Sequence, residues 1–123
     1  MSRTSQPHFD LILRGATVIS HSTNGEHDVA IRNGRIEEVA PAVRGEAVEE
    51  VDARGLHLFP GVIDVHVHFN DPGRAHWEGW ETGSAAAAVG GTTTVAEMPL
   101  NASPPTLDAA AFDAKVAAAT GRS

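Results

Sequence analysis

Apolar and polar residues alternate in short runs through the first half of the chain, with glycine or asparagine between several of them. A period of two is typical of strands that bury one face. The runs that show it are residues 9–13, 16–20, 28–32, 35–39, 48–52 and 56–59. We expect a turn at Arg14-Gly15, and a hairpin at Asn33-Gly34 because a type I′ turn needs positive φ at both positions. Residues 9–59 are therefore predicted to form a small β-sandwich or half-barrel domain.

The pattern changes after Pro60, where a longer apolar run contains two histidines. If residues 62–69 form a strand, their side chains alternate between its two faces. One face then carries Ile63, Val65, Val67 and Phe69, and the other carries Val62, Asp64, His66 and His68. A strand with one wholly apolar face and histidines on the other is typical of a parallel strand that is covered on both sides in an α/β protein.

Helix and strand patterns alternate along the rest of the chain. The alanine-rich residues 77–89 predict a helix, which Gly90-Gly91 would end. The β-branched residues 92–98 predict a strand, and residues 107–120 predict a second helix with Thr106 as its N-cap. Such a βαβα series forms a parallel sheet with right-handed crossovers.

This series is what the first two β/α units of a TIM barrel would look like, and we assign them to residues 60–123. A complete barrel needs about 250 residues, whereas the chain has 123. The predicted fold class is therefore α/β, with an N-terminal β-sandwich followed by an incomplete barrel. We expect either a fragment from the N-terminal part of a longer protein or completion by a second chain.

The composition of the chain argues against some binding partners and against some kinds of metal site. A net charge of −7 argues against nucleic acid or an anionic membrane surface as a partner. Residues 1–8 are polar, have no apolar signal-peptide segment and are expected to form a flexible tail, and a cytoplasmic location is expected. Because the chain lacks cysteine, a metal site would use histidine and carboxylate ligands.

His66 and His68 are the strongest candidates for metal ligands. On one strand face their backbones are roughly 7 Å apart, so both imidazoles reach one point, and imidazole binds zinc at about 2.0–2.1 Å. Pro60-Gly61 and residues 70–73 punctuate the strand and place the histidines at its carboxyl end, where barrels hold their active sites. The alternative is a pair of buried histidines that bond to backbone carbonyls.

Three further side chains of the second half are candidates for lining the site. Trp77 and Trp80 are three residues apart and would share a helical face, where packing is favoured over a substrate lid. Glu97 is the most plausible carboxylate to line the site, although a supporting or structural role is favoured over direct ligation.

Residues 60–68, after a small β-domain, resemble the cyclic amidohydrolases, which include dihydroorotases, hydantoinases and allantoinases. The segments that make the sequence most similar to allantoinases are residues 76–84, 90–94 and 97–101, and the resemblance covers about residues 9–119. Dihydroorotases have an arginine where this chain has Asn70, and an asparagine where it has Leu100. Both departures suit a substrate without a carboxylate, such as allantoin. Asn70 is therefore a candidate substrate-binding residue, and turn formation is the alternative.

The resemblance implies hydrolysis of a cyclic amide, here the opening of the hydantoin ring of allantoin to allantoate in purine catabolism. Dihydroorotase or hydantoinase activity is the alternative, and a non-catalytic scaffold or truncated remnant is a third possibility. Two divalent metals, zinc by expectation, would be present, with His66 and His68 on the more buried one. A carboxylated lysine, two more histidines and an aspartate would come from later strands, outside this chain. The chain alone is therefore expected to be inactive, and the full-length protein is expected to be a homotetramer.

Overall fold

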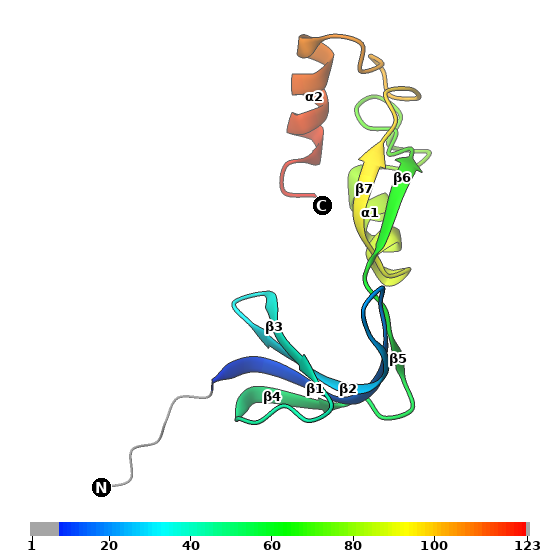
Figure 1. Ribbon diagram of the computed structural model, residues 1–123. Coiled ribbons are helices and arrows are strands. Elements are labelled where there is room, and N and C mark those ends of the chain that lie inside the picture. The colour runs from blue at the N-terminus through cyan, green and yellow to red at the C-terminus, as the bar shows by residue number, and fades with distance from the viewer. Residues whose placement is uncertain (1–7, 123) are drawn as a thin grey trace, which may run out of the picture. The chain divides into compact units, whose positions relative to one another are not determined.

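The computed structural model describes residues 8–122, which fall into two compact units divided after Pro60. The first unit contains β1 (Phe9–Ile19), β2 (Asn24–Arg32), β3 (Arg35–Ala40), β4 (Ala47–Asp52) and β5 (His57–Leu58) (Figure 1). The second contains β6 (Val62–Val67), α1 (Trp80–Val89), β7 (Thr92–Glu97) and α2 (Ala109–Ala119). No helix within residues 8–122 is long and apolar enough to cross a membrane.

The first unit is a five-stranded mixed sheet in the order β3-β2-β1-β4, with β5 also pairing with β1. β1 runs antiparallel to β2 but parallel to β4 and β5. The predicted turn at Gly15 is wrong, because β1 continues through it as one strand with an irregularity between Leu13 and Ala16. Gly15 has a φ of 68° and allows this kink without reversing the chain. As a result, β4 pairs with the first part of β1 and β5 with the last.

Two small apolar clusters form the core of this unit. The first consists of Phe9, Ile12, Ala30 and Val43, and the second of Ala16, Val18, Val29 and Ala53. Val29 and Ala30 are successive residues of β2 and therefore point to opposite faces. The alternating runs of the sequence thus form a unit whose core lies along β1 and β2, while most residues of β3 and β4 are exposed.

The hairpin predicted at Asn33-Gly34 is confirmed. Asn33 has a φ of 51° and Gly34 a φ of 71°, and Arg32 pairs with Arg35 across the turn. The predicted tail of residues 1–8 lies outside the described residues except for His8, whose backbone N–H donates to the Glu46 carbonyl at 3.0 Å.

Asp28 of β2 is a buried carboxylate that bonds to the irregular point of β1. It accepts hydrogen bonds from Arg14 Nη1 at 2.9 Å, Gly15 N at 2.8 Å and Val43 N at 3.1 Å. Burial by itself would raise the pKa of Asp28, but the bonds from Arg14, Gly15 and Val43 outweigh it and lower that pKa below its ordinary value. The carboxylate therefore ties the kink of β1 to the loop that precedes β4.

In the full-length protein, we expect Asp28→Asn to lower the free energy of unfolding of the first unit by about 1–3 kcal/mol. The reason is that the amide cannot accept hydrogen bonds from all three donors. Since the pKa of Asp28 is lowered in the folded protein, its stabilisation is present above the ordinary value of 3.8 and is lost as the pH falls through the folded value. Hydrogen exchange of peptides within residues 9–32 measures the effect, which should be largest at neutral pH and shrink in acid.

Asp52→Asn is the matched control. Its carboxylate is exposed and hydrogen bonds to Arg54, which lowers the pKa of Asp52 to about 2. Exchange in residues 9–32 should stay unchanged in this variant. Equal exchange in Asp28→Asn and the wild type would contradict the role assigned to Asp28.

The second unit has the predicted βαβα order. β6 and β7 pair in parallel, and α1 connects them (Figure 1). α1 begins at Trp80 rather than at residue 77, because Gly79 is extended at φ −103° and ψ 179°. The Asp71 carboxylate then accepts from the first helical N–H, that of Trp80, at 3.2 Å.

The N-cap predicted for the second helix is also wrong. Asp108 caps α2, and its carboxylate accepts from the Ala111 N–H at 2.8 Å. The backbone N–H of Thr106 instead donates to the Pro99 carbonyl at 2.8 Å, so this residue belongs to the preceding loop. An aspartate two residues further on offers the same capping chemistry.

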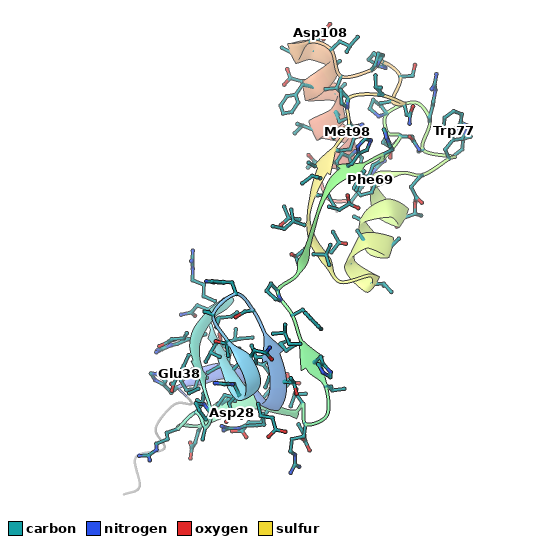
Figure 2. All side chains as sticks on the ribbon, turned by 45° about the vertical axis from the view of Figure 1, so that its right-hand side comes forward. Asp28, Glu38, Phe69, Trp77, Met98 and Asp108 are labelled. Atoms are coloured by element: carbon teal, nitrogen blue, oxygen red, sulfur yellow. The ribbon has the colours of Figure 1, made fainter. Side chains whose placement is uncertain are left out.

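Phe69 fills the space between the strand pair and α1 (Figure 2). Its ring is 4.8 Å from the Trp80 ring in an edge-on arrangement, and it is only 5% exposed. A Cβ atom added at Gly83 would lie 2.4 Å from Phe69 Cδ1. The helix therefore approaches the strands closely only because this position has no side chain.

We expect Gly83→Ala to destabilise the full-length protein. Alanine would gain about 0.8–1.0 kcal/mol of helix propensity, but crowding a packed ring costs about 1–3 kcal/mol. The apparent melting temperature at one fixed heating rate measures the net effect. Gly90→Ala is the control, since a Cβ there would come no closer than 3.4 Å to its neighbours. A higher melting temperature for Gly83→Ala would contradict the packing argument.

Candidate metal centre

His66 and His68 lie at the carboxyl end of β6. His66 is within the strand, and His68 follows its last residue, so the predicted strand of residues 62–69 is two residues too long. The two ring centroids are 5.3 Å apart with 62° between the ring planes. His66 is exposed and His68 is partly buried. Both rings border the same space, as two ligands of one ion would.

The backbone on both sides of His68 is fixed by groups from other elements. The Val67 carbonyl accepts from the Met98 N–H at 2.9 Å, and the Phe69 carbonyl accepts from Lys115 Nζ at 3.0 Å. Met98 directly follows β7 and Lys115 lies in α2. Two segments that are distant from His68 in the sequence therefore fix the backbone from which its side chain extends.

Asn101 holds the His68 ring itself. Its side-chain amide lies 3.2 Å from His68 Nδ1, and its φ of 71° is one that asparagine tolerates better than most residues. The contacting atom is the amide nitrogen Nδ2, which donates, so Nδ1 accepts and the neutral ring carries its proton on Nε2. Metal binding through Nε2 would require the amide to turn so that its oxygen accepts from Nδ1–H. No role was predicted for Asn101, although it lies in the loop that directly follows β7, where the carboxyl ends of parallel strands place site residues.

Asn70 is 6% exposed and lies in the loop after His68. Its backbone N–H donates to the Glu78 carbonyl at 2.7 Å, and its carbonyl accepts from the Arg74 N–H at 3.0 Å. Among the described residues, no partner hydrogen bonds to its buried side-chain oxygen. The backbone of Asn70 thus forms a turn, and the substrate-binding role of its side chain stays a prediction.

Glu97 ends β7 and is 2.6 Å from Lys115 Nζ. The side chains of this pair are only 11% and 7% exposed, respectively. The structure therefore engages Glu97 in an ion pair, in line with the supporting role favoured from the sequence.

The two tryptophans do not share a helical face as predicted, because α1 begins only at Trp80. Trp80 packs against Phe69, whereas Trp77 lies in the preceding loop and is 61% exposed (Figure 2). The Arg74 guanidinium lies 5.2 Å from the centre of the Trp77 ring. Packing is thus observed for Trp80 but not for Trp77.

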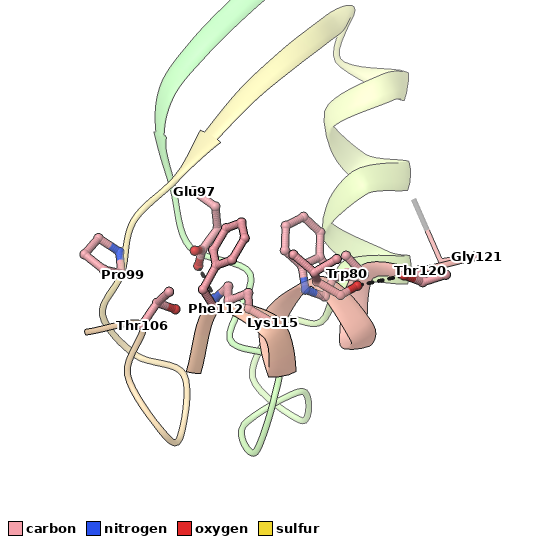
Figure 3. A pocket seen from close by; sticks show the side chains of 10 residues that line it. Trp80, Glu97, Pro99, Thr106, Phe112, Lys115, Thr120 and Gly121 are labelled. Carbon is pink, nitrogen blue, oxygen red and sulfur yellow. Dashed lines mark hydrogen bonds and ion pairs between the residues drawn. The ribbon is translucent and has the colours of Figure 1, made fainter. Parts of the chain in front are cut away.

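A cavity of about 520 Å³ opens between α2, Trp80 and the end of β7 (Figure 3). The Glu97–Lys115 pair and the side chains of Phe112 and Val116 line it. Neither His66 nor His68 belongs to its lining. The cavity is therefore separate from the candidate metal centre.

The histidine pair fits two positions of a metal ligand set. Within residues 8–122, no group of three or more histidine, cysteine, aspartate or glutamate side chains could hold an ion together. Zinc sites in proteins use three or four protein ligands. The donor chemistry of His66 and His68 therefore suits a divalent metal, provided that further ligands come from beyond the described chain.

The model of the amidohydrolase family matches residues 57–121, and the chain belongs to this family. It is 55% identical over 111 residues to an allantoinase of Rubrobacter xylanophilus and 49% identical over 112 residues to one of Desulfitobacterium hafniense. These matches cover 90% and 91% of the chain but only 24% and 25% of the relatives. The chain thus spans about a quarter of the length of these relatives.

The chain also resembles part of solved hydantoinase structures. The chain superposes on the L-hydantoinase of Arthrobacter aurescens with a TM-score of 0.80 and 34% identity, over 90% of this chain and 25% of that one. A D-hydantoinase from Bacillus sp. AR9 gives a TM-score of 0.77 at 30% identity, over 93% and 25%. The predicted fold class and the resemblance to cyclic amidohydrolases are confirmed. Amidohydrolases generally depend on a metal, which agrees with the chemistry of the histidine pair.

We expect His66→Ala and His68→Ala to lower the metal bound by the full-length protein and to abolish turnover, because each removes one ligand. Metal analysis of the purified variants measures the loss. His76→Ala is the control, since this histidine lies in the loop beside Trp77, and its metal content should match the wild type. Unchanged metal stoichiometry in both ligand variants would rule out this assignment.

Proposed function

We propose that the full-length protein is a metal-dependent cyclic amidohydrolase that opens the hydantoin ring of allantoin to give allantoate. The observation that carries this proposal is 55% identity to an allantoinase over 90% of the chain. Asn70 supports it, because a side chain without charge cannot form the bidentate pair with a substrate carboxylate that an arginine would form.

The proposed centre contains two zinc ions, one of them bound by His66 and His68. A bound metal would polarise the scissile carbonyl and make water more acidic. Within this chain, Asn101 orients the His68 ring, while Met98 and Lys115 fix the backbone on either side of it. The carboxylated lysine, the remaining histidines and the aspartate of the centre are proposed to lie outside this chain.

The proposal extends to the architecture of the full-length protein. Val62, Ile63 and Val65 of β6 are 54%, 66% and 67% exposed. Burying so apolar a strand is favourable, and the relatives are about four times longer than the matched region. We therefore propose that β6 and β7 begin a TIM barrel, in a homotetramer that acts on small molecules of purine catabolism in the cytoplasm.

Hydantoinase activity is the second candidate. The superposition on an L-hydantoinase with a TM-score of 0.80 favours it specifically. Dihydroorotase activity is less well supported, because Asn70 stands where the carboxylate-binding arginine is expected. A non-catalytic scaffold remains the alternative of another class, and the metal and activity measurements separate it from both.

Steady-state assays of the full-length protein on allantoin, hydantoin and dihydroorotate test the proposal. We expect the highest kcat/KM with allantoin and the lowest with dihydroorotate. A preference for hydantoin would support the second candidate, and a preference for dihydroorotate would overturn both. Hydrolysis of none of the three by the metal-loaded protein would favour the scaffold.

We further expect residues 1–123 alone neither to bind a stoichiometric metal pair nor to hydrolyse allantoin. Two imidazoles are fewer ligands than zinc sites use, and the open apolar face of β6 favours self-association. Metal analysis, an allantoin assay and the mass in solution measure this. A monomer with bound metal and turnover would show that the site is complete within this chain.

A further inference from the structure

Lys115 is the only lysine of the chain, and it is 5% exposed in the middle of α2. A buried ammonium group is unfavourable unless charged or polar partners surround it. Lys115 Nζ donates to the Glu97 carboxylate at 2.6 Å and to the Phe69 carbonyl at 3.0 Å. The Trp80 ring centre lies 5.9 Å away, and Figure 3 shows Lys115 and Glu97 facing each other beside Trp80.

These partners tie the ammonium group to the backbone that directly follows His68. Phe69 directly follows His68, and Glu97 is the last residue of β7. The opposite side of His68 is fixed by the bond from Met98 N to the Val67 carbonyl. Lys115 therefore supplies, from a helix, the restraint on the carboxyl side of His68.

We propose that Lys115, together with Glu97, is a positioning residue that keeps His68 in the geometry needed for metal binding. The inference rests on the proposed function, since it requires a metal at His66 and His68. Without the ammonium group, the Phe69 carbonyl loses its donor and the Glu97 carboxylate stays buried without its cation. Residues 68–70 then lose their connection to α2, and the His68 ring samples positions from which it does not bind the ion.

A purely stabilising ion pair is the competing explanation, and stability measurements alone do not separate the two. Removing one member of a buried ion pair leaves an uncompensated charge and destabilises the folded protein, whereas replacing both members often leaves the stability unchanged. Lys115→Met combined with Glu97→Gln removes the charges but keeps similar side-chain volumes. This double variant should recover melting temperature relative to Lys115→Met, yet it still lacks the donor to the Phe69 carbonyl.

The test uses the full-length protein loaded with Zn²⁺, and measures the rate of Zn²⁺ release to a chromogenic chelator at 25 °C. Outer partners of metal ligands commonly change metal affinity roughly 10–100-fold. We expect release about 10-fold faster or more in Lys115→Met and in the double variant. The visible absorption band of the Co²⁺-loaded protein should shift in both, because it reports the ligand geometry.

Arg14→Met is the matched control in the first unit, where Arg14 donates to Asp28 at 2.9 Å. It should lower the melting temperature without changing Zn²⁺ release. If Lys115→Met does not fold, Glu97→Gln replaces it, and it should accelerate release in the same direction. A double variant with wild-type release and an unchanged Co²⁺ band would overturn the inference.

The outcomes for the inference and for the proposed activity are distinguishable, because Zn²⁺ release involves no substrate. A wild-type protein that binds Zn²⁺ but does not hydrolyse allantoin would overturn the activity alone, and release from the variants would still decide the inference. A wild-type protein that binds no Zn²⁺ would overturn the inference together with the metal centre.

Discussion

The parallel pairing of β6 with β7 is the constraint on which the candidate metal centre depends. A strand alternates its side chains between two faces, so the pairing register determines which face His66 and the residues near it present. The bond from Met98 N to the Val67 carbonyl sets where this pairing ends, and His68 follows directly. The closeness of the two rings at 5.3 Å is therefore a consequence of backbone geometry at the end of the strand.

The two units meet a common requirement, the burial of a charge within a small core, in similar ways. In the first, Asp28 is surrounded by donors from Arg14, Gly15 and Val43. In the second, Lys115 is surrounded by acceptors from Glu97 and Phe69. In each case the buried group also joins a segment outside the strand pairings, since Asp28 bonds to the loop before β4 and Lys115 connects α2 to Phe69.

Much of the fold follows from local patterns in the sequence. The hairpin at Asn33-Gly34 and the βαβα order are determined by turn chemistry and by periodicity, which act over a few residues. The histidine pair at the end of β6 was predicted for the same reason. The kink at Gly15 was mistaken for a turn because only pairing with β2, β4 and β5 shows that β1 continues.

The rest of the site depends on contacts between distant segments, which no local pattern records. Lys115 lies in an alanine-rich helix, where a lysine is ordinarily exposed, and only the partners at Phe69 and Glu97 explain its burial. Asn101 contacts His68 only because the loop after β7 returns to the end of β6. The start of α1 at Trp80 was missed because the carboxylate of Asp71 accepts its first N–H.

The contact between Gly83 and Phe69 has a consequence for how related sequences diverge. Because a Cβ at Gly83 would meet the ring at 2.4 Å, the sizes of these two side chains are complementary. A larger residue at position 83 is tolerated only with a smaller one at position 69, and a smaller residue at position 69 alone leaves a void beside the helix. The two positions should therefore covary among homologues, so that the residue after the candidate ligand His68 is expected to change together with a glycine of α1.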